Sequence, residues 1–91
     1  MNRKRERLEI IHSILTAIQE KGKEVKPTHI LYKSNLSHQM LTDYLTELIK
    51  GEFIQEKDNL GKKSYSLTEK GFNYLRDYKS IKAFLDSYGL N

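Results

Sequence analysis

The chain lacks cysteine and tryptophan, contains a single proline, and has no long apolar run. Without cysteine, disulfide bonds and thiolate metal sites are excluded. No segment approaches the roughly 18 apolar residues of a membrane-spanning helix, and no apolar core of a signal peptide follows the basic N-terminal residues. We therefore expect a cytoplasmic protein that does not act at a membrane.

The composition nevertheless suffices for one small folded domain. Leu, Ile, Val and Phe number 24 of 91 residues, and 31% of the residues are charged, giving a net charge of +4. The charge is uneven, since residues 1–33 carry +4, whereas residues 34–56 carry one basic and four acidic side chains. A basic face is typical of nucleic-acid binding, although a charge of +4 also serves solubility alone.

The first half of the chain predicts three helices. Apolar residues recur every three or four positions from residue 5 to residue 21, and Gly22 follows as a helix stop. Val25 lies in a short extended segment, and Pro27 opens a second, short helix with Ile30, Leu31 and Tyr32 facing inward.

A tight turn joins the second helix to the third. Asn35 suits a left-handed turn position, and Ser37 suits the N-cap of the third helix. That helix buries Leu41, Leu45 and Leu48 and ends at Gly51. Two helices joined in this way form a helix-turn-helix.

The second half predicts a β-hairpin and a final helix. Residues 53–57 and 64–67 read as strands joined by a loop of about five residues. Thr68 is expected to cap a helix that runs to about Tyr88, with Phe72 and Leu75 closing the core.

Three motifs resemble archaeal winged-helix DNA-binding proteins. Residues 28–37, THILYKSNLS, are similar to the family segment T-x-I-x-Y-x-A-N-L-S, and Tyr44-Leu45 with Leu48 resemble the following Y-L-x-x-L. Residues 67–71, LTEKG, resemble the L-T-x-K-G that joins the hairpin to the last helix. The resemblance covers roughly residues 6–80 and includes chromatin-type proteins of about ten kilodaltons and short transcriptional regulators, some of them viral.

The resemblance implies an α+β, mainly helical winged helix-turn-helix that binds double-stranded DNA. It divides the chain into a DNA-binding domain at residues 1–71 and a C-terminal dimerisation helix at residues 72–91. Chromatin-type members dimerise through a longer C-terminal coiled coil, and this shorter helix departs from them. The expected location is the nucleoid, as a regulator or a chromatin component.

In this fold the third helix enters the major groove and the hairpin lies on the flanking backbone. The candidate base readers are His38, Gln39 and Thr42, whereas Asp43 and Glu47 on the same helix would repel phosphate. No Arg or Lys lies between Ser34 and Thr46, so we expect modest sequence specificity. The complete predicted DNA-binding set is Arg3, Lys4, Arg5, Lys33, Ser37, His38, Gln39, Thr42, Lys57, Lys62 and Lys63.

The last helix carries a second apolar stripe with the spacing of a coiled-coil seam. Its residues are Tyr74, Tyr78, Ile81, Leu85 and Tyr88. The stripe predicts a homodimer interface, and the alternative is that it packs back on the first helix.

The sequence offers little support for catalysis. The five glycines form no phosphate-binding motif, and the three histidines fall on separate helices without metal-ligand spacing. We expect no enzyme activity, no metal or other cofactor, and no small-molecule ligand. The competing hypothesis is a winged-helix protein-interaction module without direct DNA binding, which the net negative charge of residues 34–56 favours.

Overall fold

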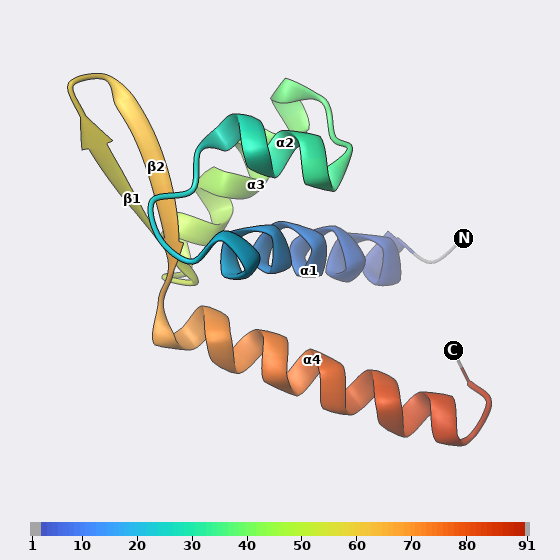
Figure 1. Cartoon of the computed structure of the whole chain (residues 1–91). Coiled ribbons are helices and arrows are strands. Elements are labelled where there is room, and N and C mark those ends of the chain that lie inside the picture. The colour runs from blue at the N-terminus through green and yellow to red at the C-terminus, as the bar shows by residue number, and fades with distance from the viewer. Residues whose placement is uncertain (1–2, 91) are drawn as a thin grey trace.

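A computed structural model describes the backbone of residues 3–90 and the side chains of residues 7–90. Four helices and one hairpin follow one another in the predicted order (Figure 1). Their bounds are α1 Arg3–Lys21, α2 Pro27–Ser34, α3 His38–Lys50, β1 Ile54–Asn59, β2 Lys62–Leu67 and α4 Glu69–Ser87. The predicted fold class is therefore confirmed. Among the described residues, no helix is long and apolar enough to cross a membrane.

The predicted helix ends are confirmed, because each depends on local chemistry. The Ser37 and Thr68 hydroxyls accept the amides of Met40 and Gly71, which caps α3 and α4. Asn35 has a left-handed backbone, with φ of 53°, and closes α2 by donating its backbone amide hydrogen bond to the Leu31 carbonyl.

The core lies between α1, α2, α3 and the base of the hairpin. Ile14, Leu15 and Ile18 of α1 are fully buried, and the predicted leucines of α3 join them. Val25 forms a single antiparallel bridge with Tyr65, which ties the segment between α1 and α2 to β2.

The hairpin is longer and its turn tighter than the sequence predicted. The strands pair from Ile54 with Leu67 to Asn59 with Lys62, so only Leu60 and Gly61 form the turn. The predicted loop of about five residues is wrong. Both turn residues have positive φ, and such two-residue turns match the twist of paired strands, which extends the pairing outward.

The residues of the LTEKG motif fasten the start of α4 to the turn between α3 and β1. Thr68 Oγ1 donates to the Glu52 carbonyl at 2.6 Å, and Lys70 Nζ donates to the Gly51 carbonyl at 2.8 Å. A Cβ on Gly71 would lie 2.3 Å from the Phe53 carbonyl oxygen, so no larger residue fits without backbone movement.

Two predicted core residues are exposed. Tyr32 is 87% exposed because it lies two positions, or about 200°, around α2 from the buried Ile30. Phe72 is 48% exposed, whereas Leu75 is buried as predicted. Because the core is small, α2 and the first turns of α4 each bury only a narrow helix face against it.

Candidate nucleic-acid interface

The outward face of α3 is polar and exposed, as a base-reading helix requires. His38, Gln39 and Thr42 all lie on it, together with Thr46. The Thr42 hydroxyl donates to the His38 carbonyl at 2.9 Å, and the Thr46 hydroxyl donates to the Thr42 carbonyl at 2.9 Å. Because both hydroxyl protons are used within the helix, these threonines present methyl groups and oxygen lone pairs outward.

The two acidic residues of α3 have partners. Gln39 Nε2 donates to Asp43 Oδ1 at 3.0 Å, and Glu47 forms an ion pair with Arg7 of α1. The Arg7 guanidinium also lies 5.6 Å from the centre of the Tyr44 ring. The repulsion between these carboxylates and phosphate that the sequence predicted is therefore reduced. Arg7 of α1 contacts side chains of α3.

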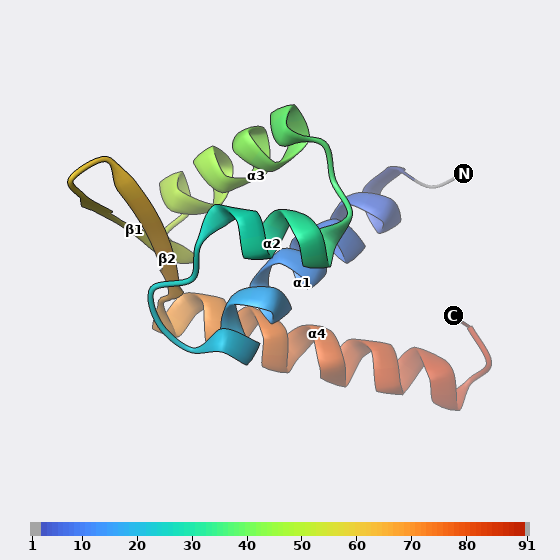
Figure 2. The same ribbon diagram turned by 45° about the horizontal axis from the view of Figure 1, so that its top comes forward.

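A groove of about 320 Å³ lies between the N-terminus of α2, one side of α3 and the inner face of the hairpin. Figure 2 shows the hairpin beside α3 and the start of α2. The lining residues are Pro27, Thr28, Leu31, His38, Leu41, Thr42, Leu45, Thr46, Ile49, Glu56, Lys63 and Tyr65. The predicted residues His38 and Thr42 of α3 thus share one concave surface with Lys63 of the hairpin, about 20 residues further along the chain.

The three hairpin lysines lie on two faces, because side chains alternate along a strand. Lys63 lines the groove, and its Nζ lies 3.9 Å from Glu56 Oε2. Lys57 and Lys62 belong to the opposite face. Lys57 Nζ donates to Glu24 Oε1 at 3.2 Å and forms an ion pair with it. Lys62 has no ion pair within the described side chains.

A tyrosine holds the acidic partner of Lys63. The Tyr65 hydroxyl donates to Glu56 Oε2 at 2.9 Å. Burial and this hydrogen bond raise the pKa of Tyr65, so the phenol stays protonated as a donor throughout the neutral range. The arrangement fixes Glu56 and places Lys63 beside the groove.

A family model described as winged helix-turn-helix matches residues 4–85. The chain belongs to the winged helix-turn-helix family. The resemblance inferred from the three motifs is confirmed, and archaeal and viral winged-helix proteins are among the similar structures. In the terms of this family, α3 is the recognition helix and the hairpin is the wing.

One curated relative is an uncharacterized protein of Methanocaldococcus jannaschii, 40% identical over 68 residues. The match covers 75% of this chain but only 29% of the relative, so this winged helix spans less than a third of that protein.

Two solved structures show the same fold. The chain is similar to Sso10a-2, a DNA-binding protein from Sulfolobus solfataricus, with a TM-score of 0.73, 24% identity and coverage of 90% and 86% of the two chains. It is also similar to F93 from STIV, a winged-helix DNA-binding protein, with a TM-score of 0.66, 21% identity and coverage of 77% and 83%.

Other predicted site residues lie outside the groove of this winged helix. Ser37 is exposed and caps the recognition helix, and Lys33 is exposed in the last turn of α2. The side chains of Arg3, Lys4 and Arg5 lie outside the described residues.

Sequence reasoning did not assign Thr46 and Thr28 to the site, although both line the groove. Thr46 could have been found, because it stands four residues after Thr42 and eight after His38 on one helix face. Thr28 had no such signal, since its approach to α3 depends on tertiary packing. Thr28 is the second residue of α2. Pro27 before it has no amide proton, and the His29 and Ile30 amides donate to the Lys26 carbonyl. Of the first amides of α2, the one at Thr28 is therefore left to contact an anion.

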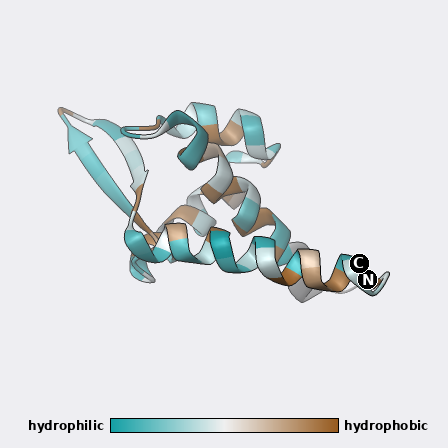
Figure 3. Ribbon diagram, turned by 60° about the horizontal axis from the view of Figure 1, so that its bottom comes forward, coloured by the Kyte–Doolittle hydropathy of each residue, from teal (hydrophilic) through white to brown (hydrophobic). Residues whose placement is uncertain are grey.

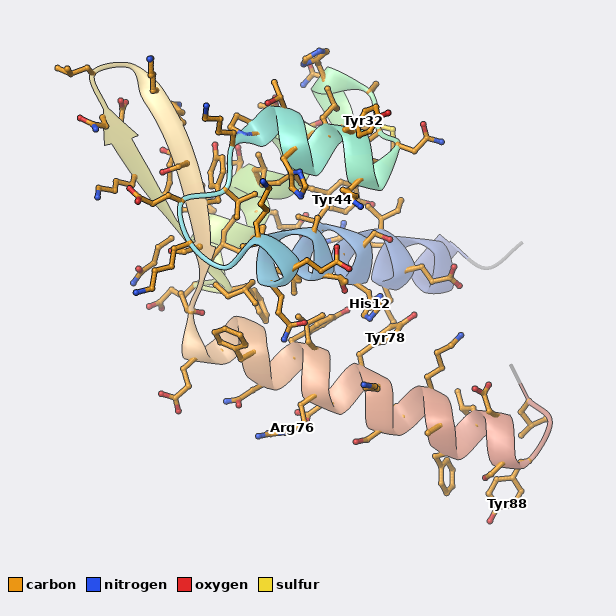
Figure 4. All side chains as sticks on the ribbon, in the orientation of Figure 1. His12, Tyr32, Tyr44, Arg76, Tyr78 and Tyr88 are labelled. Atoms are coloured by element: carbon orange, nitrogen blue, oxygen red, sulfur yellow. The ribbon has the colours of Figure 1, made fainter. Side chains whose placement is uncertain are left out.

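The stripe on α4 divides between two environments. Tyr74 packs edge-to-face on Phe53, with ring centres 5.8 Å apart, and Tyr78 stacks on His12 of α1 at 4.3 Å. Figure 4 shows His12 and Tyr78 between the two helices and Tyr88 at the far end of α4. Burial, and secondarily Lys82, lower the pKa of His12. The first half of the stripe therefore packs on the chain's own core.

The second half of the stripe is more exposed. Ile81 and Tyr88 of the stripe, and Phe84 beside them, are between 61% and 67% exposed, and the Phe84 and Tyr88 ring centres lie 5.1 Å apart. Hydrophobic colour marks this end of α4 in Figure 3. Leu85 is half-buried. The dimer interface predicted from the sequence stays a prediction, with its exposed part now confined to the end of α4.

The described residues contain no group of three or more His, Asp or Glu side chains that could hold a metal ion.

Proposed function

We propose that this chain binds double-stranded DNA as a transcriptional regulator or nucleoid component. The observation that carries the proposal is the concave surface that joins the polar face of α3, the uncapped start of α2 and Lys63 of the wing. A major groove accommodates a helix of this kind, and phosphates suit the Thr28 amide and the lysines around it. Sso10a-2 and F93, described as DNA-binding proteins, support the same function.

The proposal assigns different roles to the predicted residues. His38 and Thr42 lie toward the bases, with Gln39 on the other flank of the helix face. Lys62, Lys63 and Ser37 lie toward the backbone, with Arg3, Lys4, Arg5, Lys33 and Lys57 adding cations further out. Because no Arg or Lys occurs on the outward face of α3 before Lys50, the commonest guanine contact is missing and specificity is modest. This role needs no catalytic group or cofactor and places the protein on the nucleoid in the cytoplasm.

We further propose a homodimer formed through the end of α4. Exposed Ile81, Phe84 and Tyr88 form an apolar patch on a helix that projects from the domain. Covering the patch with the same patch of a second copy would bury it symmetrically. The domain at residues 1–71 would then bind DNA and residues 72–91 would link two copies, although α4 itself is continuous across that boundary.

A salt titration tests DNA binding directly. Fluorescence anisotropy with a random duplex should give a linear decrease of log affinity with log salt concentration, because bound lysines release counterions from the phosphates. Lys62→Ala with Lys63→Ala should lower the slope by about 1 per lost contact on every duplex. Gln39→Ala with Thr42→Ala should leave the slope unchanged and reduce discrimination between sequences.

The second candidate is a protein-interaction module. It is favoured by the leucine-rich floor of the groove and by the net negative charge of residues 34–56. If the protein binds no duplex at low salt, the DNA-binding proposal is contradicted and the protein-interaction module is favoured.

A further inference from the structure

The turn at the tip of the wing contains a residue that its backbone disfavours. Leu60 has a φ of 55° and Gly61 a φ of 81°, and the Asp58 carboxylate holds the turn by accepting the Gly61 amide at 2.9 Å. Turns with two positive φ values favour Asn or Gly at the first position. A leucine in the left-handed region costs about 1–2 kcal/mol because its Cβ approaches the backbone.

Leu60 gains no compensating burial in the folded chain. It is 97% exposed, the highest exposure among the large hydrophobic residues described. Two strands of six residues carry it away from the helices, and Figure 3 shows hydrophobic colour at the turn of an otherwise hydrophilic hairpin end. Neither backbone preference nor packing accounts for leucine at this position.

The neighbours of Leu60 indicate the kind of partner it would suit. Lys62 follows the turn without an ion pair in the described part of the chain, and Lys63 comes next. The nearby Asp58 carboxylate is engaged by the Gly61 amide. An apolar tip beside cations matches the minor groove, where proteins insert Leu or Ile between base steps while Lys contacts the phosphates. One leucine offers little area to a membrane surface.

We propose that Leu60 is a minor-groove wedge that partly unstacks a base step beside the site occupied by α3. This inference rests on the proposed DNA binding. With strands of about 3.4 Å per residue, the wing projects its tip by roughly 20 Å, enough to reach the groove next to the one that α3 enters. Lys62 would contact a phosphate as Leu60 enters, and the DNA would bend away from the wing.

The test is Leu60→Asn in the full chain, compared with Leu60→Met. Asn relieves the turn and removes the wedge, whereas Met keeps an apolar tip. We expect L60N to melt at the same temperature as the wild type or higher, and to bind a random duplex about tenfold more weakly with an unchanged salt slope. End-to-end energy transfer on a dye-labelled duplex should show bending with the wild type and L60M but not with L60N.

The outcomes separate the wedge from DNA binding itself. Wild-type affinity and bending in L60N would overturn the wedge and leave DNA binding intact. A reduced salt slope in L60N would also overturn it, because Leu60 would then act only by positioning lysines. No binding by the wild type would remove the proposed function first. Leu60-dependent binding to anionic vesicles, without bending of DNA, would assign the tip to a lipid surface and overturn the wedge.

Discussion

Apolar residues recur with similar spacing in both halves of α4, but the two halves lie in different environments. In the first half, Gly71 packs against the Phe53 backbone and Tyr78 stacks on His12 of α1. In the second half, Ile81 and Phe84 are each 61% exposed and contact neither α1 nor the wing closely enough to be buried. Regular spacing thus shows that a helix has an apolar face without showing whether that face meets its own chain or another one.

The largest effect is expected where α4 touches the core most closely. Gly71→Ala should destabilise the domain by about 3 kcal/mol, because the new Cβ collides with the Phe53 carbonyl. In an exposed helix the same change stabilises by about 1 kcal/mol. Urea denaturation followed by circular dichroism measures the difference. Ser80→Ala, on the exposed part of α4, is the control and should change stability by less than about 0.5 kcal/mol.

The second prediction concerns the second half of α4, which projects from the domain. Ile81→Glu with Phe84→Glu should convert a dimer into a monomer while the circular dichroism spectrum is kept, since both side chains are exposed in the single chain. DNA affinity should then decrease by about a hundredfold, because two linked binding sites become separate. Light scattering at micromolar concentration checks the mass. A wild-type chain that is monomeric under these conditions contradicts the dimer proposal.

The third prediction concerns the contact between the first half of α4 and α1, where Tyr78 stacks on His12. Burial lowers the pKa of His12 below its ordinary value of 6.5, so the unfolded chain binds this proton more readily than the folded chain. The free energy of unfolding should therefore decrease as pH falls through 6.5 toward the lower folded pKa. His12→Gln cannot take up the proton and should lose less stability between pH 7.5 and pH 5.5. Equal losses in both proteins would contradict a role for His12.

The smallest effect is expected at Lys82, just beyond that contact. Its charge is the lesser cause of the lowered His12 pKa, after burial. Lys82→Gln should raise the pKa of His12 slightly, toward its ordinary value, without unfolding the domain. A titration of the imidazole signals by NMR measures this change. A lower His12 pKa in the variant would contradict the assigned sign.

The fold could be predicted more fully than the site. The LTEKG motif indicated the join between wing and last helix, and the structure supplies its reason in the bonds from Thr68 and Lys70 to the α3–β1 turn. The sequence could not reveal that Arg7 neutralises Glu47 or that Glu24 engages Lys57. Each of these pairs joins residues far apart in the chain, so their charges looked free.

The sequence by itself determined the order of the elements and their ends. Hydrophobic spacing and the caps at Ser37, Asn35 and Thr68 act within a few residues, and local steric and hydrogen-bonding rules decide them. Only the tertiary structure decided that Lys63 faces the groove while Lys62 faces away. Strand register determines on which face of the hairpin each side chain lies. It also decided which half of α4 packs on its own chain, since Tyr78 stacks on His12 of α1 whereas Ile81 and Phe84 are mostly exposed.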